Sequence, residues 1–395
     1  MKVLVSNLGS TSFKYRLYDM TNEQQLARGG VERIGAPESR CFVEIGSHKS
    51  EMTLSVPNHG VAVDACISQL TDPNHGCIRD ASEISAIGFK AVHGGRISGV
   101  HRIDESVLQA MDEMNSVAPA HNPPYMAAMK QLASMSRIPL VAAFETDFHQ
   151  TIPEAWKRYA LPSSLASALP IRKWGFHGAS HRYIAGRSSE LIGRTDARVI
   201  SCHLGGSSSL CAIKAGKSVA TTMGMSPQSG LPQNNRVGDL DPFALPLMME
   251  HSGLTLTELL QELSTKAGLL GLSGGLSGDI RDIESAADAG NADAKLALDV
   301  YVAEIRRQMG GMMMAMGGLD AVVFTGGIGE NGKRIRTLIC DGLQDLGISL
   351  CQDKNQSGSS ERRIDDGTGR VELWIIPTNE EIVVARQTVA AILKP

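Results

Sequence analysis

The 395-residue sequence has no unbroken apolar run of about 20 residues, the length that a membrane-spanning helix needs. Its seven cysteines include no Cys-x-x-Cys pair and no histidine partner at zinc-ligand spacing, which indicates free thiols in a reducing compartment. The net charge of −4 is spread along the chain, without the basic stripe of a nucleic-acid-binding protein. The N-terminus shows no signal-peptide pattern. We therefore expect a cytoplasmic protein that binds neither nucleic acid nor a membrane.

The Gly-x-x-x-x-Gly-Lys-Ser/Thr motif of P-loop proteins is also missing. Glycine itself is plentiful, with 41 residues, and it suits tight turns and backbone that lies close to a ligand. Residues 327–332 match Gly-x-Gly-x-x-Gly, but late in the chain, where a dinucleotide site is not expected. A turn that holds adenosine or its phosphates fits better, and an ordinary tight turn is the alternative.

Strand and helix patterns alternate along the chain, which predicts an α/β fold, and the length favours two domains. Strands are expected at 2–6, 13–19, 86–92, 140–144, 198–203, 210–214, 321–325 and 371–376. Helices are expected at 104–114, 124–136, 279–284, 293–316 and 380–393. Residues 352–369, polar and rich in serine and glycine, are predicted to form a surface loop.

Two segments look like copies of one hairpin. Residues 7–14 and 203–210 share a polar residue, a glycine and a run of hydroxyl residues, each between two strands. The similarity suggests a duplicated domain with a cleft between the copies, and a chance match is the alternative. The expected domains are 1–148 and 149–381, with a C-terminal helix at 382–395 that completes the first domain.

Some single residues have side chains suited to phosphate chemistry. Arg236 lies in a loop without hydrophobic periodicity, where it could meet the equatorial oxygens of a transferring phosphoryl group. The alternative is a surface arginine paired with Asp239. His177 and His181 have i, i+4 spacing, but Gly178 and an expected helix start weaken a zinc interpretation. A histidine taken alone is more often structural.

Two acidic segments also have two interpretations each. Asp279 and Arg281 follow a glycine- and serine-rich loop, and they either contact a nucleotide or form an ordinary capped helix start. Glu380 and Glu381 could supply an oxygen to Mg²⁺. They could equally be acids that the dipole favours at a helix N-terminus.

Taken together, these segments resemble the acetate kinase family, within the acetate and sugar kinase/hexokinase/actin superfamily. The resemblance runs nearly end to end, and its motifs occur in the family's order. They lie at residues 7–14, 92–95, 118–123, 148–153, 175–183, 203–205, 236–242, 324–331 and 376–381.

This resemblance implies duplicated actin-like, ribonuclease H-like domains with a central nucleotide cleft. It also implies direct in-line transfer of the ATP γ-phosphoryl group to acetate, which gives acetyl phosphate and ADP in a reversible reaction. Mg²⁺, which Mn²⁺ could replace, would be held by Asn7 and Glu380. The family pattern and the methionine-rich helix favour a homodimer.

The family pattern implies a role for each remaining site residue. His177 and Arg236 look like transition-state stabilisers, with His121 beside the phosphoryl group and Glu145 near the reaction centre. Ser10 and Ser12 line the phosphate path. The residues expected to bind the acid are Lys90, Val92, Ala120, Phe176 and Pro227. The residues expected to bind ATP are Lys14, His203, Leu204, Gly205, Gly206, Ser207, Asp279, Ile280, Arg281, Gly327, Ile328, Gly329, Glu330 and Asn331.

Several positions depart from the family pattern. Lys90 stands where the family has an arginine, and Glu145 where it has an aspartate. Gly206 and Ser207 replace an asparagine and a glycine, so a phosphate contact is lost or remade. Ala120 replaces a leucine and should enlarge the acid pocket, and 232–235 reads Pro-Gln-Asn-Asn instead of Met-Met-Gly-Thr.

Three hypotheses therefore stand. They are an acetate kinase, a kinase for propionate or another short-chain acid, and a nucleotide-binding regulator without turnover. Ala120 motivates the second of these. Lys90, Glu145 and Gly206 motivate the third.

Overall fold

The computed structural model describes residues 1–9, 11–118, 121–135, 137–358 and 360–394, and the side chain of Met135 is also left out. The chain forms two compact units. The first unit consists of Met1–Asp147 together with Asn379–Pro395, and the second unit is Phe148–Thr378. No helix within the described residues combines the length and the apolarity that crossing a membrane requires.

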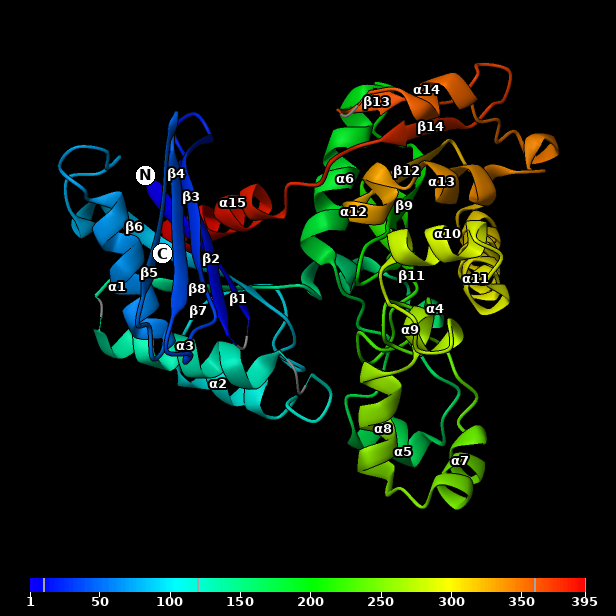
Figure 1. The fold of residues 1–395 in the computed structure, drawn as a ribbon, viewed down its shortest axis with the longest axis horizontal. Coiled ribbons are helices and arrows are strands. Elements are labelled where there is room, and N and C mark those ends of the chain that lie inside the picture. Colours follow the sequence, from blue (N-terminus) through cyan, green and yellow to red (C-terminus); the bar gives the residue numbers. More distant parts are fainter. Residues whose placement is uncertain (10, 119–120, 136, 359, 395) are drawn as a thin grey trace. The chain divides into compact units, whose positions relative to one another are not determined.

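The first unit contains an eight-stranded sheet in the order β5-β4-β3-β2-β1-β6-β8-β7 (Figure 1). Strands β1 to β5 form antiparallel neighbours, whereas β6 runs parallel to β1 and β8 runs parallel to β6. The strands are β1 (Lys2–Gly9), β2 (Ser12–Asp19), β3 (Gln24–Glu32), β4 (Ser39–Ile45), β5 (His48–Leu54), β6 (Ile84–Ala91), β7 (Val100–Arg102) and β8 (Leu140–Phe144).

Helices cover both faces of this sheet. On one face α1 (His59–Leu70) and α3 (Asn122–Met135) pack over a core that includes Leu4, Phe13 and Met129, and α2 (Glu105–Asp112) packs on α3. The other face carries α15 (Glu380–Leu393), drawn in red in Figure 1. The alternation of side chains along β1 explains this division, because Leu4 and Val5 point to opposite faces. A short 3₁₀ helix, η1 (Ala81–Glu83), precedes β6, and η2 (Asp147–Thr151) follows β8.

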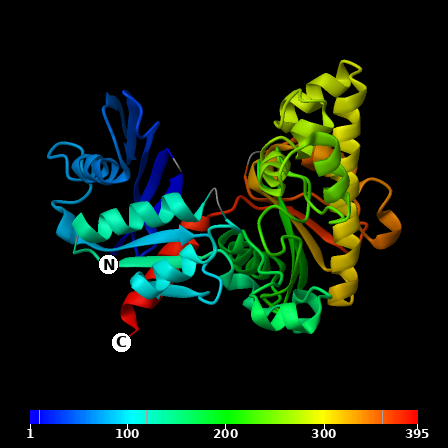
Figure 2. The same cartoon turned by 90° about the horizontal axis from the view of Figure 1, so that it is seen from below.

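The second unit contains a six-stranded sheet in the order β11-β10-β9-β12-β14-β13. The strands are β9 (Arg198–His203), β10 (Ser209–Lys214), β11 (Lys217–Thr221), β12 (Ala321–Thr325), β13 (Arg362–Arg363) and β14 (Glu372–Ile375). Figure 2 shows α11 (Ala292–Met316), 25 residues long, in the second unit. It packs on one face over Ile200, Leu210 and Phe324, and α6 (Gly178–Ile192) packs on the other.

Shorter helices complete the second unit. They are α4 (Glu154–Lys157), α5 (Ser163–Ala168), α7 (Ala244–Ser252), α8 (Leu256–Thr265), α9 (Gly268–Leu272), α10 (Ile280–Asp288), α12 (Gly326–Asn331), α13 (Lys333–Cys340), η3 (Gln344–Leu346) and α14 (Gln352–Gln356). Of the methionines on α11, Met309, Met312 and Met316 are buried in the core, whereas Met314 is exposed.

The two sheets share one strand order, which confirms the predicted duplication. In the first unit the series is β3-β2-β1-β6-β8-β7, and in the second it is β11-β10-β9-β12-β14-β13. In both, the first three strands are mutually antiparallel, the fourth and fifth run parallel to the third, and the last is an antiparallel edge strand. Such agreement over six strands is far more specific than the hairpin similarity alone.

The prediction that 352–369 is a surface loop is wrong in part, because the segment contains α14 and β13. Two of its polar residues, Asn355 and Asp365, are buried with polar partners. The fully buried Arg336 donates to Asn355 Oδ1 at 2.7 Å and to the Asn355 carbonyl oxygen at 3.2 Å. Asp365, also buried, accepts from Arg363 at 2.6 Å. A polar sequence indicates a surface loop only when its side chains lack such partners.

The packing of α15 on β6 predicts that Gly88 cannot be enlarged. A β-carbon there would collide with Thr388 Oγ1, which donates to the Val384 carbonyl oxygen and cannot swing away freely. We expect Gly88→Ala to lower the free energy of unfolding of the first unit by about 1–3 kcal/mol, as over-packing does in other cores. Urea denaturation measures this change.

Gly186→Ala is the matched control, because nothing lies within 4 Å of an added β-carbon at that exposed position in α6. It should be neutral or stabilising by up to about 1 kcal/mol. A Gly88→Ala variant as stable as the parent would contradict the close approach of α15.

Candidate active site

In the β1–β2 hairpin, Asn7 of β1 lies directly opposite Lys14 of β2. Asn7 Oδ1 accepts a hydrogen bond of 3.0 Å from the Tyr125 hydroxyl, and that hydroxyl accepts one of 3.2 Å from the Leu8 N–H. The Asn7 amide is thereby fixed. Lys14 Nζ is largely exposed and lies 3.5 Å from Glu32 Oε1. Ser12 opens β2, and Ser10 lies outside the described residues.

A partly buried group of charges lies at the ends of the parallel strands of the first unit. Lys90, near the end of β6, donates to Glu380 Oε2 at 2.6 Å, and Glu380 is the first residue of α15. Glu145 follows β8, and its N–H donates to the Ala91 carbonyl oxygen at 2.8 Å. Burial disfavours the Lys90 cation, but the carboxylates of Glu380 and Glu145 outweigh burial and raise the pKa of Lys90. Lys90 is therefore a permanent cation at this edge of the sheet.

The donor set around Glu380 suits a magnesium ion that also binds phosphate. A cavity of about 10 Å³ is lined by Asn7, Lys90, Glu380 and Glu381, among others. Among the described residues no group of three or more His, Cys, Asp or Glu side chains could hold a metal by itself. Mg²⁺ in phosphoryl-transfer enzymes takes one or two carboxylates and completes its shell with substrate phosphates and water. One carboxylate and one amide oxygen fit that requirement.

The other expected residues of the first unit lie near these strands. Val92 is buried directly after β6. His121 immediately precedes α3, and its N–H donates to the Ala118 carbonyl oxygen at 3.0 Å. Ala120 lies outside the described residues, so its predicted effect on the acid pocket stays a prediction.

In the second unit, His177 has an unusual backbone conformation. Its φ of 57° is left-handed, which costs free energy for a residue with a side chain, and such strain is common at functional sites. Its Nδ1 lies 2.8 Å from Ser209 Oγ, which is 2.9 Å from His181 Nε2. The ring of His177 stacks on that of His203, with centroids 4.3 Å apart. These contacts fix the direction in which the His177 ring points.

Two further histidines lie beneath His177. His181 is fully buried between Ser209 and Ser201, and His149 is buried between Ser218 and the Phe176 carbonyl oxygen. Burial lowers the pKa of His149 to about 4 and that of His181 well below its ordinary value. Both rings are therefore neutral at pH 7, and they pack as a hydrogen-bonded layer.

Arg236 lies half-buried among neutral oxygens. Its Nη1 is 3.3 Å from Ser207 Oγ, 3.3 Å from Gln233 Oε1 and 3.5 Å from the Pro227 carbonyl oxygen. Burial lowers the pKa of Arg236, although the guanidinium keeps its charge at pH 7. Asp239, the partner that the alternative interpretation proposed, accepts instead from the Gly230 N–H at 2.8 Å. In the described part of the chain, no carboxylate forms an ion pair with Arg236.

The backbone of the Arg236 loop is held tightly. Gly268, at the start of α9, has a φ of 60°, and a β-carbon there would lie 2.6 Å from the Arg236 carbonyl oxygen and 2.9 Å from its nitrogen. Only glycine permits so close an approach. The Gln233 side chain is also fixed, because its Nε2 donates to the Pro227 carbonyl oxygen at 2.8 Å.

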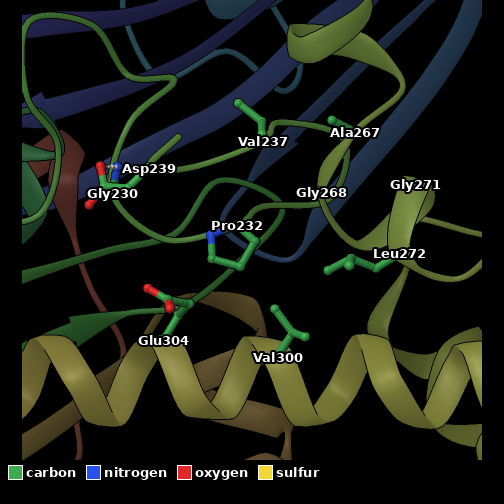
Figure 3. Close-up of a pocket in the computed structure, with 10 residues that line it drawn as sticks. All are labelled: Gly230, Pro232, Val237, Asp239, Ala267, Gly268, Gly271, Leu272, Val300 and Glu304. Atoms are coloured by element: carbon green, nitrogen blue, oxygen red, sulfur yellow. Dashed lines mark hydrogen bonds between the residues drawn. The ribbon is translucent and has the colours of Figure 1, made fainter. Parts of the chain in front are cut away.

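A cavity of about 350 Å³ lies behind this loop (Figure 3). Figure 3 shows Pro232 and Val237 of the loop on one side and Val300 and Glu304 of α11 on the other. Its charged lining residues are Asp239 and Glu304, both carboxylates, and the rest of the lining is apolar or glycine. None of its lining residues is a cation that could offset these two carboxylates, so this cavity is a poor candidate for a nucleotide or a carboxylic acid.

A larger cavity of about 450 Å³ in the second unit has a lining better suited to a nucleotide. The expected ATP-binding residues that line it are Gly205, Gly206, Asp279, Ile280, Arg281, Gly327, Ile328 and Asn331. Those that do not line it are Lys14, which belongs to the first unit, and His203, Leu204, Ser207, Gly329 and Glu330. Glu330 has a structural contact there, because its Oε1 accepts from the Gly326 N–H at 3.0 Å.

The rim of this cavity carries an ion pair, and its lining includes residues that received no role from the sequence. Arg281 donates to Asp279 at 2.9 and 2.5 Å, which lowers the pKa of Asp279 to about 2. Asn234 and Glu284 also line the cavity. Glu284 lies one helical turn after Ile280, so their i, i+4 spacing was a usable signal. No local pattern pointed to Asn234.

Two sheets with one strand order, and a glycine-lined cavity at the end of β9 and β12, define an α/β protein of the duplicated actin-like class. The profile of the Acetokinase family matches residues 2–386. The chain belongs to this family.

Individual relatives are similar over nearly the whole chain. An acetate kinase of Methanosarcina acetivorans is 44% identical over 393 residues, covering 98% of this chain and 96% of its own length. The crystal structure of Porphyromonas gingivalis acetate kinase has a TM-score of 0.90 at 37% identity, with 99% of each chain covered. A propionate kinase from Francisella tularensis also gives 0.90, at 32% identity, with 98% of this chain and 99% of its own covered.

The buried histidines predict a pH dependence of stability. The unfolded chain protonates His149 near its ordinary value of 6.5, whereas the folded chain does so only near 4. Between these values the unfolded state binds more protons, so the free energy of unfolding falls as the pH falls. We expect a loss of about 3 kcal/mol from His149 between pH 6.5 and 4. Urea denaturation at several pH values measures the slope.

His149→Gln should flatten that slope, whatever its effect at pH 7. His251→Gln, at an exposed position of α7, should leave the slope unchanged. Equal slopes in the parent and in His149→Gln would show that His149 is not kept neutral by burial.

Proposed function

We propose that the chain is an acetate kinase, which transfers the γ-phosphoryl group of ATP to acetate and forms acetyl phosphate and ADP. One observation carries the proposal. Arg236 is a half-buried cation whose described contacts are neutral oxygens, in a loop whose Asn234 lines the nucleotide-sized cavity. Such a cation attracts an anion more strongly than one already paired. Membership of the acetokinase family supports the same activity.

The reaction needs positioning and charge neutralisation more than acid–base chemistry. Acetate is ionised at neutral pH, so its oxygen attacks the γ-phosphorus without a general base. A new P–O bond forms to the carboxylate oxygen, and the bond to the β–γ bridging oxygen breaks and leaves ADP. Arg236 and His177 stabilise the equatorial oxygens in the transition state, Arg236 through its positive charge. His121, Glu145, Ser10, Ser12 and Lys14 complete the phosphoryl path.

In this proposal Asn7 and Glu380 would hold Mg²⁺, or Mn²⁺ in its place. When bound, the ion neutralises phosphate charge. Lys90 donates to Glu380, so ion binding must share or displace that contact. A lysine can leave a carboxylate by rotation of one flexible chain, whereas an arginine would hold both oxygens in a fork.

A kinase for propionate is the second candidate. The expected acid pocket consists of Val92, Ala120, Phe176 and Pro227, and the small Ala120 favours a larger acid. The similarity to the Francisella tularensis propionate kinase supports the same candidate. A homodimer in the cytoplasm completes the proposal, and a nucleotide-binding regulator without turnover is its main rival.

An assay of acyl phosphate formation separates these candidates. With ATP and Mg²⁺, trapping by hydroxylamine should detect acetyl phosphate and also measurable turnover of propionate. A kcat/KM for propionate more than about 100-fold below that for acetate would remove the argument for an enlarged pocket. Absence of any acyl phosphate, together with retained ATP binding, would favour the regulator.

Replacement of Arg236 tests the transition-state role. Arg236→Ala should lower kcat at least about 100-fold, the usual effect of losing one transition-state contact. Arg236→Lys should recover part of this loss, because it keeps the charge without the fork. Arg194→Ala, at an exposed site beside Asp196, is the control and should be near normal. A near-normal kcat in Arg236→Ala would exclude Arg236 from the mechanism.

A further inference from the structure

Gly206 has no side chain, but the side chain of Asn234 lies directly beside it. A β-carbon on Gly206 would lie 3.1 Å from Asn234 Nδ2, 3.7 Å from its Cγ and 3.9 Å from its Oδ1. The amide of Asn234 therefore occupies the place toward which a side chain at position 206 would point. Gly206 and Asn234 both line the nucleotide-sized cavity.

The backbone of Asn234 is fixed on three sides. Its N–H donates to the Gly206 carbonyl oxygen at 3.3 Å, and its carbonyl oxygen accepts from the Leu270 N–H at 2.8 Å. Gly278 also approaches closely, because a β-carbon there would lie 2.8 Å from the Asn234 carbonyl oxygen. The backbone from which the Asn234 amide projects is thus fixed by the fold, as suits a group that binds a ligand specifically.

The side-chain amide, in contrast, has no hydrogen-bond partner within the described chain. Asn234 is half-buried, so leaving its two N–H donors without a ligand is tolerable but gains nothing from the protein. Two residues further on, Arg236 contacts Ser207, the neighbour of Gly206. The Asn234 amide therefore lies at the glycine-rich part of the cavity, in the same loop as the Arg236 cation, whereas Ile280 and Ile328 give an apolar lining elsewhere in it.

We propose that Asn234 donates its side-chain amide to a phosphate oxygen of the bound nucleotide, in place of a side chain at position 206. The inference rests on the proposed function, since it takes a nucleoside di- or triphosphate as the ligand. It adds a specificity-determining residue for that ligand. Gln233, which accepts from Arg236 through Oε1, is a positioning residue in the same loop.

Direct nucleotide binding tests this proposal without the acid substrate. Calorimetric titration with MgADP should give an affinity at least about tenfold lower for Asn234→Ala, as expected for loss of a hydrogen bond to a charged group. Binding of adenosine, which has no phosphate, should change by less than about twofold. An equal loss for adenosine and MgADP would overturn the assignment to a phosphate.

An exchange of side chains is the sharper experiment. Gly206→Asn alone should weaken MgADP binding, because its side chain and the Asn234 amide compete for one space. The double variant Gly206→Asn/Asn234→Gly should bind MgADP within about threefold of the parent. A double variant that folds but binds no better than Asn234→Ala would overturn the proposal.

Controls separate this inference from foldedness and from the proposed function. Asn235→Ala changes the adjacent asparagine, which does not line the cavity, and should bind MgADP as the parent does. Asn234→Asp keeps the shape but repels phosphate, so it should bind MgADP more weakly than Asn234→Ala at an unchanged melting temperature. A parent that binds no MgADP would overturn the proposed function as well. Normal binding by both Asn234 variants would overturn this inference alone.

Discussion

The parallel pairing of β9 with β12 is the constraint on which the nucleotide side of the structure depends. Its register places His203 beside Thr325, so both strands end at the same edge of the sheet. Beyond that edge the Leu204 carbonyl oxygen accepts from the Ile328 and Gly329 N–H groups at 2.8 and 3.0 Å. The two glycine-rich turns are thereby joined to each other before any ligand binds. In the first unit, β1 and β6 have the same parallel relation, and Asn7 and Lys90 lie at the ends of those two strands.

A second constraint concerns charge, and the two units meet it differently. In the first unit, the half-buried Lys90 has a carboxylate partner, which raises its pKa and keeps it ionised. In the second unit, Arg236 is held by neutral oxygens, and burial lowers its pKa. A paired cation organises its surroundings, whereas a cation held by neutral groups retains attraction for an incoming anion. Arg236 is therefore a better candidate than Lys90 for contact with the transferring phosphoryl group.

Local pattern predicted much of the fold. Strands 140–144, 198–203 and 321–325 and the helix 380–393 have the predicted bounds, since each is a short apolar run or an amphipathic segment between clear breakers. The segment 352–369 was predicted wrongly in part, because Arg336, outside the segment, provides a buried partner for Asn355. Asn234 was missed for the same kind of reason. Its place beside Gly206 follows from a contact across 28 positions of sequence, and no local rule contains such a contact.

Gly206 and Asn234 show how a side chain lost from one motif can be supplied by a neighbouring segment. A ligand responds to an amide at a point in space and not to the strand that carries it. A residue missing from one motif is therefore weak support for lost activity until the neighbouring segments have been located. Gly206 was one of three departures that motivated a regulator without turnover, and on this proposal it no longer does so. Lys90 and Glu145 remain, and they lie together at the ends of adjacent strands, where Glu145 helps to keep Lys90 charged. A lysine for an arginine and a glutamate for an aspartate leave the charges of the site unchanged. These two departures therefore affect the geometry of the site and the choice of acid more than the transfer of phosphate.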